Sequence, residues 1–190
     1  MDEQFTKGHL VTLMISSLIA TGFGAGWWFS GTASVDGPRT VLVILGIVAV
    51  VALVAWVLML GRRGAGLPAG GGRGDSPFGK RYGIAVLLMV VGIFAGARVL
   101  TGVFDLPEAV PAWVLLLVGL HFVPFSRLFG TRRFTVLAIM LCAVAVLGAV
   151  FGAAGQAWAW RAVPGFGGAV VLWGTAVAGL LANAKELHKA

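Results

Sequence analysis

Charged side chains are scarce in this sequence of 190 residues. Only 11% of the residues are Asp, Glu, Lys or Arg, whereas 59% are hydrophobic, and the mean hydropathy is +0.97. Soluble domains carry roughly 25% charged residues, so this chain lacks the charge that a water-facing surface needs. The composition therefore excludes an ordinary soluble domain and predicts a membrane protein.

Cysteine and membrane-buried acid are almost absent. Cys142 is the single cysteine, which excludes an intramolecular disulfide framework and a cysteine-based zinc site. No Asp or Glu stands within an apolar run, which argues against di-metal hydrolysis and carboxylate-driven proton pumping. His9 and His188 are far along the chain from His121, so the histidines predict neither a three-His metal site nor bis-His haem. We expect no cofactor and no metal.

Long apolar runs recur along the chain. About 20 apolar residues suffice for one crossing of a bilayer, and these runs lack the alternation that a β-barrel requires. The sequence predicts an all-α membrane protein, a six-transmembrane-helix bundle that forms one integral membrane domain over residues 1–190. Short connections predict that consecutive helices pack as antiparallel pairs. The expected spans are about 10–29, 39–60, 82–104, 110–129, 134–154 and 164–184, with a flexible glycine-rich loop at about 61–81.

Lys and Arg gather on one side of this predicted topology. Cytoplasmic loops carry an excess of Lys and Arg, so we expect both termini in the cytoplasm and the protein in the bacterial cytoplasmic (inner) membrane. The net charge of +7 follows from this bias, and the expected partners are membrane lipids, not nucleic acid. Only Arg39 and Arg161 lie on the opposite side, while Arg98 lies within a span. The eleven residues of the basic side are Lys7, Arg62, Arg63, Arg73, Lys80, Arg81, Arg127, Arg132, Arg133, Lys185 and Lys189.

Similarities between the spans leave two interpretations open. The second and fourth spans begin with PRTVLVILG and PAWVLLLVG. Either three helical hairpins descend from one unit, or membrane helices simply draw on the same few residues. Glycines four residues apart predict close helix contacts or, alternatively, room for a ligand. The pairs are Gly22 with Gly26, Gly92 with Gly96, and Gly148 with Gly152.

Aromatic and basic residues near the non-cytoplasmic side are the first candidate binding residues. Trp27, Trp28 and Trp113 fit an interfacial aromatic belt, or a platform on which a ligand binds. Arg98 lies about sixteen residues into its span. Its side chain either snorkels to the interface, where acidic partners stand, or grips the anionic group of a ligand.

His121 is the second candidate. It lies about ten residues after Pro111, near the membrane midplane, and cannot snorkel. Pro124 frees the backbone carbonyl of Leu120, so a structural interpretation has that carbonyl accept the ring N–H of His121. A functional interpretation makes His121 a catalytic acid or base, or a ligand-binding group, because histidine titrates near neutral pH.

The stretch VGLHFVPFSRLF contains a Gly-Leu-His-Phe-x-Pro-x-x-x-x-Phe pattern. In this respect the chain resembles a group of small bacterial multi-pass membrane proteins of uncharacterised function. Members of that group often have an acidic residue in the preceding span, where this chain has Arg98. The resemblance implies a membrane bundle with a singular histidine and supplies no activity. The pattern falls on Gly119, Leu120, His121, Phe122, Pro124 and Phe129.

Three functions compete at this point. The first is the binding or carrying of a small amphipathic or anionic molecule in an intramembrane cavity, with Arg98 and the tryptophans around it and His121 at its floor. The second is a membrane-embedded enzyme of the cyclase or isomerase type, in which His121 is the acid or base for a lipophilic substrate and Arg98 stabilises an anion. The third is a non-catalytic assembly subunit. A homo-oligomer also remains open.

Overall fold

The computed structural model describes residues 5–70, 80–128 and 130–189, and all regular structure in these ranges is helical. Six helices are long and apolar enough to cross a membrane, which confirms the expected all-α membrane bundle. Two short 3₁₀ helices, η1 (Gly64–Gly66) and η2 (Pro107–Ala109), follow α2 and precede α4. The long helices are α1 (Lys7–Thr32), α2 (Arg39–Arg63), α3 (Lys80–Gly102), α4 (Val110–Leu128), α5 (Arg132–Ala153) and α6 (Ala159–Lys189).

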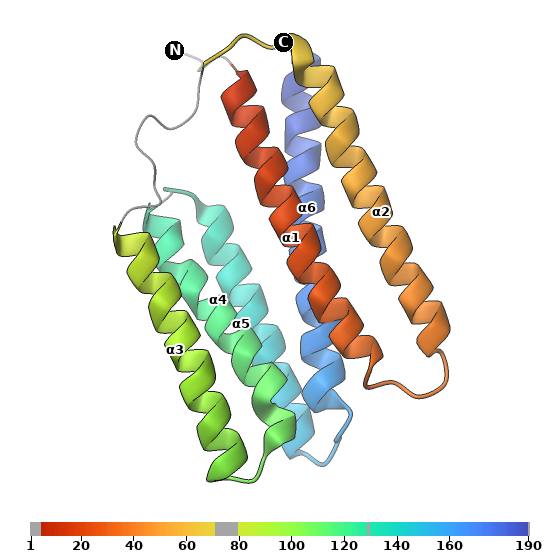
Figure 1. Cartoon of the computed structure of the whole chain (residues 1–190), viewed down its shortest axis with the longest axis vertical. Helices are drawn as coiled ribbons and strands as arrows, with labels where there is room; N and C mark the ends of the chain where they lie inside the picture. Colours follow the sequence, from red (N-terminus) through yellow and green to blue (C-terminus); the bar gives the residue numbers. More distant parts are fainter. Residues whose placement is uncertain (1–4, 71–79, 129, 190) are drawn as a thin grey trace.

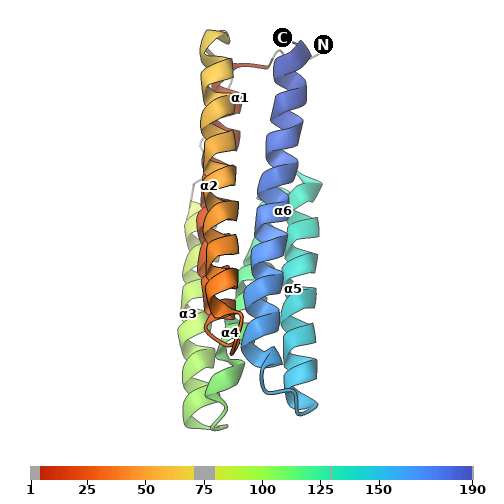
Figure 2. The same ribbon diagram turned by 90° about the vertical axis from the view of Figure 1, so that its right-hand side faces the viewer.

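Helix α6 is the centre of the bundle. It packs on α1 and α2 on one side and on α5 and α4 on the other, whereas α3 contacts mainly α4 (Figure 1). Figure 2 shows the same molecule from the side, with α6 and α5 next to each other. Consecutive helices pack as pairs at α1–α2, α3–α4, α4–α5 and α5–α6, as the short connections predict. Helices α2 and α3, joined by the long loop, lie at opposite edges (Figure 1).

The start of α1 and the end of α6 lie at the same end of the bundle (Figure 1). We call this the terminal end and the opposite one the distal end. Arg39 and Arg161 lie near the first residues of α2 and α6, at the distal end, while the basic residues at the ends of α2 and α4 and at the start of α5 lie at the terminal end. The predicted segregation of charge therefore holds in the described ranges. The side of the membrane that each end faces stays a prediction.

Two buried apolar clusters hold α6 to its neighbours. One joins α4, α5 and α6 and includes Leu115, Leu141 and Leu172. The other joins α2 to α6 and includes Val57 and Leu180. Helix α3 has no buried residue in its most apolar stretch, so the other described helices leave most of its surface uncovered.

The helix ends differ from the expected spans in one informative place. Helix α6 begins at Ala159, five residues before Pro164, although the proline was expected to start the span. Pro164 is buried, and it packs on the backbone at Gly148 of α5. Its missing N–H affects only the carbonyl four residues earlier, at the very start of the helix, so the helix tolerates it. Residues 71–79 of the expected loop and Phe129 lie outside the described residues.

The predicted glycine contacts are confirmed in two pairs and wrong in the third. Gly92 and Gly96 face α4, and Gly148 and Gly152 face α6. The pair in α1 was wrong, because Cβ atoms built at these two glycines would meet nothing within 4 Å. Helix α1 turns its other face to α6, and Gly24 and Gly31, seven residues apart, make the close contacts. The spacing of four identified small residues in α1, but it did not identify the buried face.

Three tryptophans on different helices pack in the same way. Each indole lies over a glycine of a neighbouring helix, and its N–H donates to the backbone carbonyl three or four residues before that glycine. A Cβ on the glycine would overlap the indole, so glycine is what allows this donor to reach its acceptor where no water is present. The contacts are Trp28 over Gly46 with the Leu42 carbonyl (2.8 Å), Trp113 over Gly96 with the Gly92 carbonyl (3.1 Å), and Trp173 over Gly24 with the Thr21 carbonyl (3.1 Å).

Replacing Gly96 with alanine is expected to lower the free energy of unfolding by about 1–3 kcal/mol, the usual cost of overpacking. The added methyl group displaces the Trp113 indole and removes its hydrogen bond to α3. Unfolding of the purified protein in detergent micelles measures this loss. Gly83→Ala is the matched control on the same helix, because nothing lies within 4 Å of a Cβ at Gly83. Equal stability of the two variants would contradict the packing role.

Candidate functional site

The structure does not bring Arg98 and His121 together. Trp113 of α4 packs on Gly96 of α3, and the two helices run antiparallel. Arg98 therefore lies beside the start of α4, about ten residues from the level of His121. Ten residues correspond to about 15 Å at the helical rise of 1.5 Å per residue. Arg98 is exposed, and His121 is only half-buried.

His121 is held by its own helix. Its Nδ1 lies 2.6 Å from the carbonyl oxygen of Val118, and its ring packs on Phe122 and Phe125 at centroid distances of 4.3 and 4.9 Å. The expected bond to the Leu120 carbonyl was wrong. Helical side chains point back toward the helix N-terminus, so the ring reaches the carbonyl three residues before it and not the one directly before it.

This hydrogen bond also determines which tautomer the neutral His121 ring adopts. A carbonyl oxygen only accepts, so Nδ1 carries the proton and, in the neutral ring, Nε2 is the acceptor. An aromatic cluster surrounds the ring: Tyr82 of α3 stacks on Phe125, and Phe134 of α5 stacks on Phe122. The sequence did not predict that α3, α4 and α5 meet here through aromatic rings. The catalytic or ligand-binding role of His121 stays a prediction.

Trp27, Trp28 and Trp113 all take part in helix packing. Trp28 and Trp113 bond to carbonyls of neighbouring helices, and Trp27 packs against the cluster between α4, α5 and α6 and on Gly168. None of them lines the cavity at the terminal end or the cavity at the distal end. Their role toward a ligand stays a prediction.

A cavity with a mainly apolar lining and several polar groups lies at the terminal end, between α1, α5 and α6. Its volume is about 530 Å³, within the range of about 300–1,000 Å³ typical of small-molecule sites. One part of the wall is apolar, and the other carries ionisable groups from two helices. The lining residues are Phe5, Leu13, Arg133, Ala178, Leu181, Ala182, Asn183, Lys185 and Glu186.

Asn183 is the unusual residue in this wall. Only 1% of its surface is exposed, and neither its Nδ2 nor its Oδ1 has a hydrogen-bond partner among the described residues. A buried polar group without a partner costs about 1–3 kcal/mol. A molecule that bonds to the amide from within the cavity would remove this cost.

The charges around the cavity favour an anion. Arg133 and Lys185 contribute two positive charges against the one negative charge of Glu186. Arg133 also stands in the first turn of α5, which has no acidic residue. A helix N-terminus carries a partial positive charge, so the arginine and the helix dipole have the same sign there.

The described residues contain no group of three or more His, Cys, Asp or Glu that could hold a metal ion. Cys142 has a structural contact instead. Its sulfur would lie 2.7 Å from a Cβ built at Gly119 and is 3.8 Å from the Leu116 carbonyl. Gly119 therefore lets α5 approach α4 closely.

The fold defines a class, the polytopic α-helical membrane proteins. Within that class the chain belongs to a family of unknown function, DUF7010, whose model matches residues 80–180, slightly more than half of the chain. No curated protein and no solved structure matches it. The family agrees with the expected resemblance to uncharacterised proteins, while the GLHF pattern itself stays a prediction. The matched range includes Arg98, His121 and Arg133 and ends before Asn183.

A signal for Asn183 is present in the sequence, although a search for charged residues does not find it. Counting along α6, Leu172, Ala176, Leu180 and Asn183 follow one another at intervals of four, four and three residues, and all four are buried. This spacing places them on one helix face. A single amide in a buried apolar stripe is a polar group that needs a partner.

Proposed function

We propose that this protein is a multi-pass protein of the bacterial cytoplasmic membrane that binds a small amphipathic anion, as a carrier or receptor. The unpartnered, buried amide of Asn183 in the wall of the terminal-end cavity carries this proposal. The amide offers both a donor and an acceptor. The same wall offers two cations for an anionic group and apolar side chains for a hydrocarbon tail.

The place of the cavity fits such a ligand. Arg133 lies in the first turn of α5 and Lys185 near the end of α6, where we expect the membrane surface, while Leu13 lies in α1 and Leu181 in α6, both within the apolar spans. A ligand bound there would have its charged group at the interface and its tail along the helices. With the basic end of the bundle in the cytoplasm, the site opens toward the inner leaflet.

The enzyme alternative has less support. A cyclase or isomerase that uses His121 as acid or base and Arg98 as anion stabiliser needs both groups on one substrate. The two residues lie about 15 Å apart along the bundle at the helical rise of 1.5 Å per residue, and neither lines the described cavities. The assembly alternative requires a surface that binds a partner chain. The Gly–Trp contacts join helices of the same chain, so they give that alternative no support.

A titration with an anionic amphiphile tests the proposal. Dodecyl phosphate is added to the purified protein in a neutral detergent, and binding is measured by calorimetry. Arg133→Gln and Asn183→Leu are each expected to weaken binding by about 10-fold to 150-fold, the equivalent of a charge-assisted hydrogen bond of about 1.5–3 kcal/mol. Arg98→Gln is the matched control, an exposed cation outside the cavity, and should bind as the wild type does.

Dodecyltrimethylammonium controls for the tail, because it has the same chain and the opposite charge. It should not bind at this site. Binding of dodecyltrimethylammonium that Arg133→Gln or Asn183→Leu weakens as much as it weakens phosphate binding, or unchanged binding of the phosphate to Asn183→Leu, would refute the site.

A further inference from the structure

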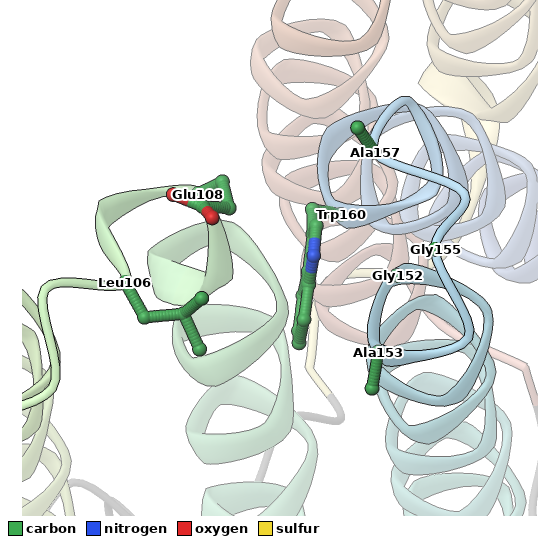
Figure 3. A pocket seen from close by; sticks show the side chains of 7 residues that line it. All are labelled: Leu106, Glu108, Gly152, Ala153, Gly155, Ala157 and Trp160. Carbon is green, nitrogen blue, oxygen red and sulfur yellow. The ribbon is translucent and has the colours of Figure 1, made fainter.

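A second cavity lies at the distal end, between the turn that leads into α4 and the connection from α5 to α6 (Figure 3). Its volume is about 420 Å³, enough for one small molecule. Small residues, among them Gly152 and Gly155, form one part of its wall. The larger side chains that line it are Leu106, Glu108 and Trp160. These residues all differ from those of the terminal-end cavity, so a ligand of the distal cavity is independent of the proposed anion site.

The indole of Trp160 is fixed in the middle of this cavity wall. A Cβ built at Gly152 would overlap the indole, so the ring lies directly on the backbone of α5. Figure 3 shows the indole edge-on, with Leu106 and Glu108 on one side and Ala153 on the other. One aromatic face is therefore directed toward the side of the cavity that holds the carboxylate.

The charge of this cavity is opposite to that of the chain. Glu108 is half-buried and is the one charged side chain among the described residues that line it. The whole chain has a net charge of +7, yet no Lys or Arg belongs to this wall. A cation bound in the cavity would balance the charge of Glu108.

The kind of cation follows from the groups present. A carboxylate beside an aromatic face is the combination that recognises ammonium groups, which gain from the negative face of the indole. A divalent metal needs several oxygen ligands, and within the described ranges no cluster of three acidic, His or Cys residues exists. We infer that the distal cavity binds an alkylammonium group, from a free amine or from the headgroup of a zwitterionic phospholipid.

Choline chloride, which supplies a quaternary ammonium ion, is the probe for a free alkylammonium ligand. Its binding to the wild type is measured by calorimetry in a neutral detergent. Glu108→Gln keeps the size of the side chain and removes the charge, and it should weaken binding at least about tenfold. Trp160→Leu should weaken it by about 2-fold to 30-fold, whereas Trp160→Phe, which keeps an aromatic face, should retain most of it. Asp36→Asn is the matched control, an exposed acid between α1 and α2 at the same end, and should leave binding unchanged.

A second experiment, with lipids, distinguishes a free ligand from a phospholipid headgroup. The wild type and Glu108→Gln are reconstituted in nanodiscs with phosphatidylethanolamine and phosphatidylglycerol, and released for native mass spectrometry. Retention of phosphatidylethanolamine by the wild type and its loss from Glu108→Gln identify the headgroup as the ligand. Choline binding that depends on Glu108, without retention of phosphatidylethanolamine, identifies a free alkylammonium ion. If neither choline nor the ethanolamine lipid depends on Glu108, the inference is overturned. Thermal unfolding of each variant shows that the fold is intact.

Discussion

Replacing Asn183 with leucine is expected to stabilise the ligand-free protein and to weaken anion binding about 10-fold to 150-fold. Leucine has the same number and branching of side-chain heavy atoms as asparagine and needs no hydrogen bond, so the variant avoids the cost of about 1–3 kcal/mol for an unpartnered buried amide. For a chain of this length, 1 kcal/mol corresponds to about 2–4 °C in the unfolding temperature. Thermal unfolding in a neutral detergent, without added amphiphile, measures the shift.

This prediction is specific because the same substitution is expected to raise the stability of the ligand-free protein and to weaken anion binding. An asparagine that only locks helices together would give a destabilised leucine variant. Asn183→Asp is a useful companion, because it adds a negative charge beside Glu186 in a wall meant for an anion and should lose binding without gaining stability. A leucine variant that is less stable than the wild type would show that the amide is satisfied within the protein, and the proposed site would fail.

Gly165→Ala is expected to cause the largest loss of stability of any single methyl group in the bundle. A Cβ at Gly165 would lie 2.5 Å from the Cα of Gly31 and 2.6 Å from its nitrogen. Both obstacles are backbone atoms of α1, so no side-chain movement relieves the overlap, and α1 must move away from α6. We expect a loss of about 3 kcal/mol, the upper end of the usual cost of overpacking. Chemical or thermal unfolding in detergent measures it.

Gly22→Ala is the matched control on α1. Gly22 is exposed, and a Cβ there meets nothing within 4 Å. Alanine at this position is expected to be neutral or to stabilise the helix by up to about 1 kcal/mol, because glycine weakens a helix. A destabilising Gly22→Ala together with a harmless Gly165→Ala would mean that α1 presents its other face to α6.

The number and kind of helices were predictable because each span is a long apolar run between polar breaks, and no tertiary information is needed to see one. The sequence did not predict which face of each helix packs against its neighbours. Helix α1 carries small residues on several sides, so the sequence did not distinguish Gly24 and Gly31, which contact α6, from Gly22 and Gly26, which do not.

The candidate site was predicted less well for a related reason. His121 and Arg98 stand out as ionisable residues in apolar runs, but their meeting depends on the register of α3 on α4, which side-chain contacts such as Trp113 on Gly96 determine. Asn183 is uncharged and stands close to the end of its span, so charge and depth did not mark it. Asn183 stands out because it is buried, and its burial depends on how the helices pack.

Native mass spectrometry tests most directly whether the terminal-end cavity binds an anion. The wild type, Asn183→Leu, Arg133→Gln and Arg98→Gln are purified in a neutral detergent and released from it, with and without added dodecyl phosphate. We expect a bound anionic amphiphile on the wild type and on Arg98→Gln, and none on the two cavity variants. The same adduct on Asn183→Leu as on the wild type, or no adduct on the wild type even with dodecyl phosphate present, would contradict anion binding at this cavity.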